Sequence, residues 1–231
     1  MKIGIIGAGN IGGTLALRLT ALGHNVSVAN SRGPQTLARL VTETGATAVT
    51  VADAPRGAEL VVVTIPEKNI PSLPAGLFAG MPASAVVIDT GNYYPQQRDG
   101  RIDAIEAGTA ESRWVAQQLG RPVVKVFNNI YAHHLRDLGK PSGAPGRIAL
   151  PIAGDDFTAK GVVLRLIDEL GFDGVDAGSL DESWRQQPGT PVYGTDLDAA
   201  GVRRALSQAS QERTPEWHAK ANSPGTFTAR G

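Results

Sequence analysis

The glycines of one short turn near the start of the chain constrain its fold more than any other feature. Gly7, Gly9 and Gly12 fit the spacing G-x-G-x-x-G. An apolar run at residues 3–6 precedes the turn, and apolar residues at helical spacing follow it, namely Ile11, Leu15, Leu19 and Leu22. A strand, a glycine turn and a helix in this order predict the first βα unit of a dinucleotide-binding fold.

Later apolar runs predict that this unit belongs to a larger parallel sheet. The runs cover residues 26–29, 47–51, 60–65, 85–89 and 123–127, and a helix is expected between them at residues 35–44. Strands that alternate with helices at this spacing are typical of βαβ units. The predicted fold class is therefore α/β, a Rossmann-type doubly wound parallel sheet with a smaller C-terminal α/β extension.

The pattern changes near residues 129–131, which predicts a dinucleotide-binding domain at residues 1–130 and an extension at 131–231. Strands are expected at 148–153 and 173–177. Asp155 is the expected N-cap of the helix between them. The apolar stripe of that helix is Val163, Leu166, Ile167 and Leu170, and Gly171 ends it.

Two later segments are polar and rich in turns. Residues 184–194 are predicted to lie outside the core, as a substrate lid or a loop over another subunit's site, with an ordered surface loop as the alternative. From Pro215 the sequence predicts a loose or partner-docked tail.

Composition excludes several function classes. Lys and Arg together number 22, as do Asp and Glu, so a nucleic-acid or anionic membrane surface is not expected. The absence of cysteine excludes disulfides and thiolate metal sites. No apolar run approaches the ~20 residues that span a bilayer, and no signal-peptide pattern opens the chain. We expect a cytoplasmic protein.

The glycine turn predicts a pyrophosphate site. Gly7 permits a tight turn, Gly9 lets a pyrophosphate approach the backbone, and Gly12 lets the helix pack closely. The helix begins near Asn10 and Ile11, where free N–H groups favour an anion. The alternative is a tight turn that binds no ligand.

The end of the second strand bears on the choice of cofactor. NAD-binding folds commonly have an acidic residue there, which holds the ribose 2′-hydroxyl. This chain has Asn30, Ser31 and Arg32 instead, a neutral amide, a hydroxyl and a planar cation. The segment therefore predicts NADP(H), because a cation favours a 2′-phosphate. The alternative is that Arg32 is a solvated surface charge.

Other strand ends carry polar residues that we expect to meet near the nicotinamide. Ile65 and Pro66 would form an apolar floor, while Thr64 and Asn92 would orient the carboxamide. The alternatives are a hydrogen-bonded turn at 89–92 and a helix cap at 128–129. No catalytic residue is assigned, and Asn129 and His133 are the candidates.

No metal site is predicted at the neighbouring histidines of the C-terminal part. His133 and His134 are adjacent, so they face different directions on a helix, and no third ligand follows at ligand spacing. A proton donor from this pair remains an alternative.

Several of these motifs together resemble the NADP oxidoreductase, coenzyme F420-dependent family, which is also similar to the cytosolic domain of the STEAP metalloreductases. The resemblance covers roughly residues 1–182. It rests on the glycine turn and on the segments 30–32, 60–66, 124–129, 153–156 and 176–180.

The resemblance implies a reductase that passes hydride between a nicotinamide and a flat flavin-like ring, with no side-chain acid or base required. It implies that Gly9, Asn10, Ile11, Ser31 and Arg32 bind NADP, that Pro66 lies near the nicotinamide, and that residues 128–133 lie near the second ring. After Leu180 the chain departs from the deazaflavin enzymes. The small-molecule acceptor therefore stays open between deazaflavin (coenzyme F420), a flavin, a quinone, a ferric chelate and a small carbonyl compound.

Two other functions remain open from the sequence. One is a non-catalytic NADPH sensor that signals to a protein partner through its tail. The other is an imine or carbonyl reductase with His133 or His134 as proton donor. Whichever function is correct, we expect a homodimer. Neither nucleic acid nor a membrane is expected as a partner.

Overall fold

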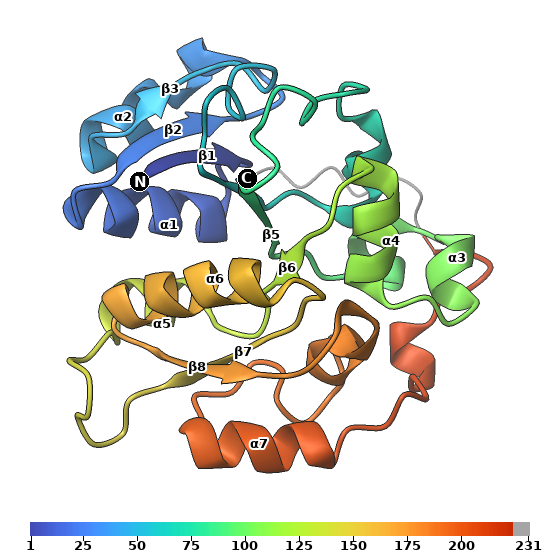
Figure 1. Cartoon of the computed structure of the whole chain (residues 1–231). Helices are drawn as coiled ribbons and strands as arrows, with labels where there is room; N and C mark the ends of the chain where they lie inside the picture. Colours follow the sequence, from blue (N-terminus) through green and yellow to red (C-terminus); the bar gives the residue numbers. More distant parts are fainter. Residues whose placement is uncertain (224–231) are drawn as a thin grey trace.

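Six parallel strands form the main sheet of the computed structural model, which describes residues 1–223. Its order is β3-β2-β1-β4-β5-β6, so the chain runs outward from β1 and then returns to add β4 on the other side (Figure 1). The predicted Rossmann-type α/β class is confirmed. The strands are β1 (Lys2–Ile6), β2 (Asn25–Ala29), β3 (Thr47–Ala48), β4 (Leu60–Val63), β5 (Val86–Asp89) and β6 (Val124–Lys125).

A second, two-stranded parallel sheet pairs β7 (Ala149–Ile152) with β8 (Asp173–Asp176). Helices α1, α5 and α6 lie between the two sheets, and α7 covers the far side of β7 and β8 (Figure 1). The α-helices are α1 (Asn10–Ala21), α2 (Ala38–Thr44), α3 (Asp103–Glu106), α4 (Glu111–Leu119), α5 (Ala132–Asp137), α6 (Phe157–Glu169) and α7 (Ala199–Ser207). The short 3₁₀ and π segments are η1 (Pro34–Leu37), η2 (Glu67–Ser72), η3 (Pro95–Asp99), η4 (Leu180–Gln186) and η5 (Pro215–Trp217). None of the helices in residues 1–223 is long and apolar enough to cross a membrane.

The main sheet is buried on both faces, which explains its continuous apolar strands. Successive residues of a strand point to opposite faces. Ile3 and Ile5 therefore pack into the cluster around α1 and α6, while Ile6 packs into a second cluster with Trp114 of α4. The first cluster also contains Leu135 and other residues after position 130, so the hydrophobic core is continuous across the predicted domain boundary.

Helix α6 forms where the sequence predicts it, although its cap is one residue later. The expected apolar stripe is fully buried, and Gly171 ends the helix with φ +91°. Asp156, rather than Asp155, is the N-cap, and its carboxylate accepts from the amides of Thr158 and Ala159. Asp155 instead accepts from the Leu180 amide at 2.9 Å and pairs with Arg113, a tertiary role that displaces it from the cap.

Three strands of the main sheet are at least two residues shorter than predicted, and one of them, β4, ends at Val63 although the predicted run is 60–65. The run at 47–51 forms only β3, and the run at 123–127 forms only β6. Phe127 adopts φ +64°, the left-handed region, so the backbone turns away from the sheet after β6. Pro151 lies in β7, which belongs to a sheet of two strands and is therefore an edge strand, where proline is tolerated.

The polar segment at 184–194 is partly buried, contrary to the prediction that it lies outside the core. Gln186 and Val192 are fully buried. The Gln186 amide donates to Asn128 Oδ1 at 3.0 Å and to the Pro151 carbonyl at 3.1 Å. These bonds satisfy the Gln186 nitrogen, whereas Gln186 Oε1 has no hydrogen-bond partner among residues 1–223. Its role as a lid stays a prediction.

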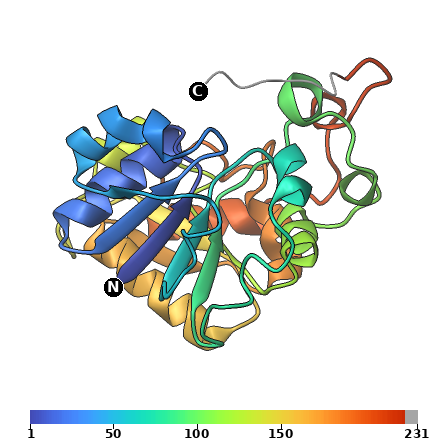
Figure 2. The ribbon, with the colours of Figure 1, turned by 90° about the horizontal axis from the view of Figure 1, so that it is seen from above.

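The C-terminal arm, residues 213–223, docks on its own chain, which corrects the prediction of a loose or partner-docked tail. Figure 2 shows the arm, in red, beside the green segment that contains η3 and α3. Gln96 Nε2 donates to the carbonyls of Pro215 and His218, and His218 Nδ1 lies 2.9 Å from Glu106 Oε2. The remainder of the predicted tail, 224–231, lies outside the described residues.

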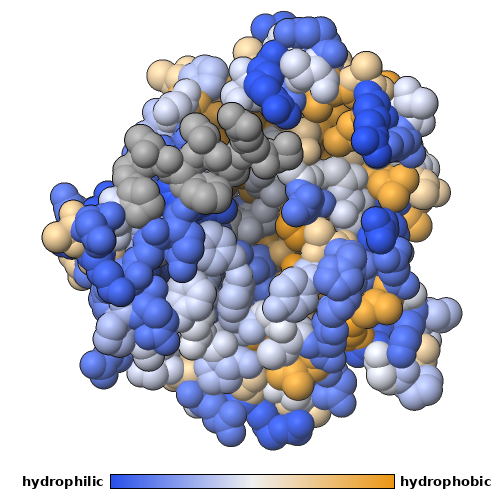
Figure 3. Space-filling view, turned by 180° about the vertical axis from the view of Figure 1, so that it is seen from behind, coloured by the Kyte–Doolittle hydropathy of each residue, from blue (hydrophilic) through white to orange (hydrophobic). Residues whose placement is uncertain are grey.

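The face of the molecule drawn in Figure 3 is mainly hydrophilic. Hydrophobic residues interrupt it in several small groups, as is usual for protein surfaces.

The arm supplies the cation of one buried ion pair. Arg213 Nη2 lies 2.5 Å from Glu111 Oε1, and the Glu111 side chain is 1% exposed. Removing one partner of a buried pair leaves an uncompensated charge, so we expect Arg213→Ala to lower the free energy of unfolding by about 3–5 kcal/mol. Urea denaturation measures the change. Arg203→Ala, at an exposed position of α7, is the control. Equal effects of the two substitutions would contradict the prediction.

Candidate functional site

The glycine turn is packed so tightly against the end of β4 that two of its glycines have no room for a side chain. Gly7 has φ +117°, and a Cβ there would lie 2.2 Å from the Thr64 carbonyl oxygen. A Cβ on Gly12 would lie 1.9 Å from the Gly7 oxygen and 2.9 Å from Thr64 Cγ2. The turn therefore holds the start of α1 directly against the sheet.

Gly9 differs from these two glycines because it faces open space. A Cβ there would meet nothing within 4 Å. Gly9 is the N-cap of α1, no side chain caps the helix, and its first turn, which begins at Asn10 and Ile11, contains no acidic residue. Unpaired N–H groups at an uncapped helix start favour an anion. The turn thus fits the pyrophosphate of a dinucleotide.

Three polar residues follow β2. One of them holds the turn after the strand, and the side chains of the other two are exposed and make no hydrogen bond or ion pair within the described residues. Asn30 Nδ2 donates to Thr36 Oγ1 at 2.9 Å, and Asn30 Oδ1 accepts from the Arg32 amide at 3.0 Å. Ser31 and Arg32 are exposed, and neither side chain has a bonding partner within the described chain. A hydroxyl and a guanidinium are therefore available where β2 ends.

The structure brings together two of the expected polar residues at the strand ends. Asn92, after β5, donates through Nδ2 to the Asn128 carbonyl at 2.9 Å, and Asn128 Nδ2 donates to Asn92 Oδ1 at 3.0 Å. Thr64 lies against the glycine turn, and Ile65 and Pro66 follow it at the same edge of the sheet. The Asn92 amide thus fixes the loop after β5, beside the ends of β4 and β6.

The two candidate catalytic residues lie in different surroundings. Asn129 is 1% exposed, and its amide oxygen and nitrogen have no hydrogen-bond partner among residues 1–223. It follows the left-handed Phe127 by two residues, and a backbone outlier of this kind often marks a functional segment. His133 is exposed on α5, its ring centroid 4.1 Å from that of His134. The buried Asn129 amide cannot contact a ligand in this conformation.

Sequence reasoning missed a group of buried charges that comes from the ends of β5 and β6 and from η2, η3 and α4. We call it the buried charge cluster, and it contains Glu67, Asp89, Asp99, Glu111 and Lys125, all at most 5% exposed. Lys125 was the available signal, because it interrupts an apolar run that has to be buried. Charged residues are almost never fully buried unless they are paired.

Lys125 and Asp89 organise the loop that follows β5. Lys125 Nζ lies 3.3 Å from Asp89 Oδ2 and also donates to the Gly91 carbonyl. Asp89 accepts from Ser112 Oγ at 2.6 Å and from the Gly91 amide at 2.8 Å. Although burial lowers the pKa of Lys125, the carboxylates of Asp89, Glu111 and Glu67 outweigh it and raise that pKa above its usual value. Lys125 is therefore a cation.

Glu67 is the member of the cluster without a partner. It is fully buried, and neither carboxyl oxygen has a hydrogen bond within residues 1–223. Burial, together with the negative charge of Asp89, raises the pKa of Glu67 well above its usual value. Burial and the neighbouring negative charges therefore favour the neutral, protonated form of Glu67.

An aromatic group that the sequence did not reveal borders this region. The hydroxyls of Tyr94 and Tyr193 are hydrogen-bonded to each other. The ring of Trp217, from the C-terminal arm, lies 6.2 Å from Tyr94 and 6.3 Å from Tyr193, centroid to centroid. The arm thus packs beside the loop after β5.

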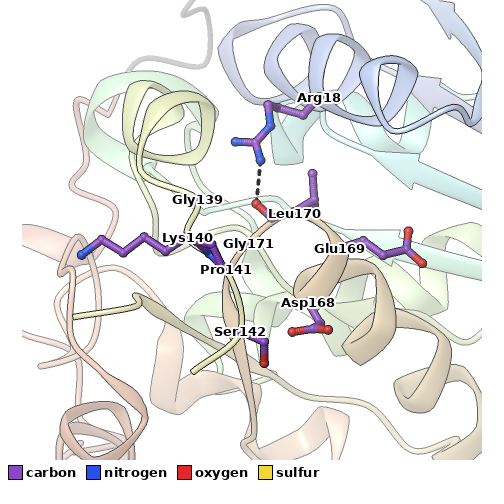
Figure 4. Close-up of a pocket in the computed structure, with 9 residues that line it drawn as sticks. All are labelled: Arg18, Gly139, Lys140, Pro141, Ser142, Asp168, Glu169, Leu170 and Gly171. Atoms are coloured by element: carbon purple, nitrogen blue, oxygen red, sulfur yellow. Dashed lines mark hydrogen bonds between the residues drawn. The ribbon is translucent and has the colours of Figure 1, made fainter. Parts of the chain in front are cut away.

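The cavity drawn in Figure 4 lies away from the glycine turn, near the other end of α1. It has a volume of about 280 Å³ and lies between Arg18, the loop at 139–142 and the end of α6. The Arg18 guanidinium donates to the carbonyls of Leu135, Arg136 and Leu170. These bonds satisfy the last carbonyls of two helices, so Arg18 has a structural role.

The protonated state of Glu67 predicts how stability depends on pH. When the pKa of an acid is higher in the folded than in the unfolded protein, the free energy of unfolding falls as pH rises above the unfolded-state pKa. The fall is about 1.4 kcal/mol per pH unit until the folded-state pKa is reached. Glu67→Gln removes this loss. We expect its free energy of unfolding to exceed that of the wild type at about pH 8, with the difference vanishing toward about pH 4. Urea denaturation across this range measures it, with the exposed Glu43→Gln as control. A variant less stable than the wild type at about pH 8 would mean that Glu67 is ionised.

Comparisons with known proteins agree with this geometry. The family model described as NADP oxidoreductase, coenzyme F420-dependent, matches residues 2–93, which include β1, the glycine turn and the loop after β5. The protein YjhV of Escherichia coli K12 is 46% identical over 71 residues, which are 31% of this chain and 52% of YjhV. The matched part thus spans about half the length of that curated relative.

Solved structures extend the likeness over most of the chain. The protein SMa0349 of Sinorhizobium meliloti is 30% identical with a TM-score of 0.70, over 85% of this chain and 95% of that one. A candidate F420-dependent NADP reductase of Arthrobacter sp. FB24 is 26% identical with a TM-score of 0.64, over 78% and 86% of the two chains. An imine reductase of Myxococcus stipitatus, 15% identical with a TM-score of 0.57 over 90% and 60% of the two chains, shares the fold. The chain belongs to the NADP oxidoreductase, coenzyme F420-dependent family.

Proposed function

We propose that this protein is an NADPH-dependent reductase that binds the dinucleotide along the carboxyl ends of β2, β1 and β4. The observation that carries the proposal is the open face of Gly9 at the uncapped start of α1, between two glycines that have no room for a side chain. In an open α/β sheet, ligands bind where the strand order reverses, and here that point lies between β1 and β4.

The adenosine half of the cofactor would lie toward β2. Ser31 and Arg32 are exposed there, and the strand end lacks a carboxylate that would repel a 2′-phosphate. Arg32 would pair with the phosphate and Ser31 would donate its hydroxyl, while Asn30 holds the turn that presents both.

The nicotinamide half would lie over the ends of β4 and β5. When bound, the cofactor supplies the hydride. Ile65 and Pro66 would form an apolar floor beneath the ring, and the loop that Asn92 and Asn128 hold together would form its polar side. Hydride transfer between two flat rings depends mainly on how closely and in what orientation they are held.

We propose a flat, conjugated acceptor, with deazaflavin as the first candidate because of the family and the Arthrobacter relative. Flavins, quinones, ferric chelates and small carbonyl compounds are the other candidates. The alternative of an NADPH sensor requires a tail that is free to bind a partner. The docking of residues 213–219 on their own chain disfavours it. The expected homodimer and cytoplasmic location stay predictions.

The cofactor preference is tested with Arg32→Ala. A charge-assisted contact contributes about 1.5–3 kcal/mol, so the substitution should weaken NADPH binding by roughly 10- to 100-fold. NADH binding should change little, because NADH has no 2′-phosphate. Fluorescence titration with both reduced cofactors measures this, and Arg39→Ala on the surface of α2 is the control. An equal loss for both cofactors would contradict the assignment.

The reaction is tested by following NADPH oxidation with each acceptor class in turn. We expect turnover with one class, and loss of that turnover in Gly9→Ala. A methyl group at this position enters open space, so stability should be unchanged while the pyrophosphate is displaced. Gly12→Ala is the contrasting variant, because its methyl group collides with the Gly7 backbone and should destabilise the fold. Tight NADPH binding without any turnover would favour the sensor.

A further inference from the structure

The buried charge cluster has four acids, and together with the two arginines that pair with it there are only three cations to balance them. Lys125 pairs with Asp89 at 3.3 Å, Arg98 with Asp99 at 2.9 Å and Arg213 with Glu111 at 2.5 Å. Glu67 is the acid that remains, and neither of its oxygens has a hydrogen-bond partner within residues 1–223. Ionising it would add an unpaired negative charge to a fully buried site.

Charged groups on four other elements act electrostatically on Glu67. Asp89 lies on β5, Lys125 on β6, Glu111 on α4 and Asp99 on η3. A Cβ on Gly91 would lie 2.3 Å from Glu67 Oε1 and 3.0 Å from Asp89 Oδ1, so both carboxyl groups approach the same point of the loop after β5. The neighbouring acids outnumber the neighbouring cation, which favours the protonated form of Glu67.

Glu67 is also close to the proposed cofactor site along the chain. It directly follows Pro66 and lies three residues after Thr64, whose carbonyl packs against Gly7 of the glycine turn. The loop after β5, which Glu67 contacts at Gly91, continues into Asn92 at the nicotinamide side of that site. A charge on the nicotinamide would therefore act on a carboxyl group in a medium that screens it weakly.

We propose that Glu67 makes this protein distinguish oxidised from reduced cofactor in a pH-dependent way, holding its proton when NADPH is bound and releasing it when NADP⁺ is bound. The inference rests on the proposed function. The oxidised ring carries one positive charge that the reduced ring lacks, and an opposite charge favours an ionised carboxylate.

The proton balance follows directly. Binding of NADP⁺ to the protonated protein gives a complex with ionised Glu67 and one proton in solvent. Binding of NADPH leaves the proton in place. By linkage, the affinity for NADP⁺ relative to that for NADPH rises with pH. Each unit by which the pKa of Glu67 is lower in the NADP⁺ complex than in the NADPH complex corresponds to a tenfold change in the ratio of the two dissociation constants. The cofactor's 2′-phosphate titrates in both forms, so it cancels from the ratio.

The test measures dissociation constants of NADP⁺ and NADPH by calorimetry from about pH 6 to about pH 9. In the wild type we expect the ratio Kd(NADP⁺)/Kd(NADPH) to fall by about tenfold across the range. In Glu67→Gln, which keeps the shape of the neutral acid, the ratio should be constant, and in the exposed control Glu43→Gln it should follow the wild type. A constant ratio in the wild type, or the same slope in Glu67→Gln, would overturn the inference.

A second measurement does not depend on the variant. Calorimetry in buffers of different ionisation enthalpy counts the protons released by the wild type. We expect the binding of NADP⁺ to release more protons than the binding of NADPH. Equal numbers of protons released by the two cofactors would overturn the inference. Failure of the wild type to bind either nucleotide would overturn the proposed function itself, which separates the two failures.

Discussion

The close approach of the glycine turn to the end of β4 is the contact on which the rest of the structure depends. Gly7 has no room for a Cβ atom because of the Thr64 carbonyl, and Gly12 has none because of the Gly7 carbonyl. This contact fixes α1 across the junction of β1 and β4, where the order of the sheet reverses. It leaves the uncapped start of α1 facing open space at Gly9, where the backbone can bind an anion.

A second constraint comes from charge, because the sheet edge beside the turn is built on buried ionisable groups. Lys125 holds Asp89 and the Gly91 carbonyl, and these fix the loop that carries Asn92. Buried ion pairs add little net stability, but their geometry is rigid once every partner is present. The C-terminal arm completes the set, since its Arg213 provides the cation for Glu111. Packing of the arm and order at the strand ends are therefore coupled.

Much of the fold could be predicted from local pattern. Apolar runs gave the strands of the main sheet, and the stripe from Val163 to Leu170 gave α6, because a strand or helix buried in the core has to be apolar. The errors occurred where a tertiary contact prevailed. Asp155 bonds to Leu180 and Arg113, so Asp156 caps the helix. Gln186 is buried because amide and carbonyl partners from distant segments surround it.

The candidate site divides in the same way. The sequence by itself determined the glycine turn, the missing acid after β2 and the polar ends of β4 to β6. Each of these features depends only on residues that are a few positions apart in the sequence. Only the tertiary structure decided which groups meet: Asn92 with Asn128, the arm with Glu111, and Glu67 with Asp89 and no cation of its own. Burial and charge pairing depend on residues far apart in the chain. Their effect on a carboxyl group is therefore set by the fold and not by local sequence.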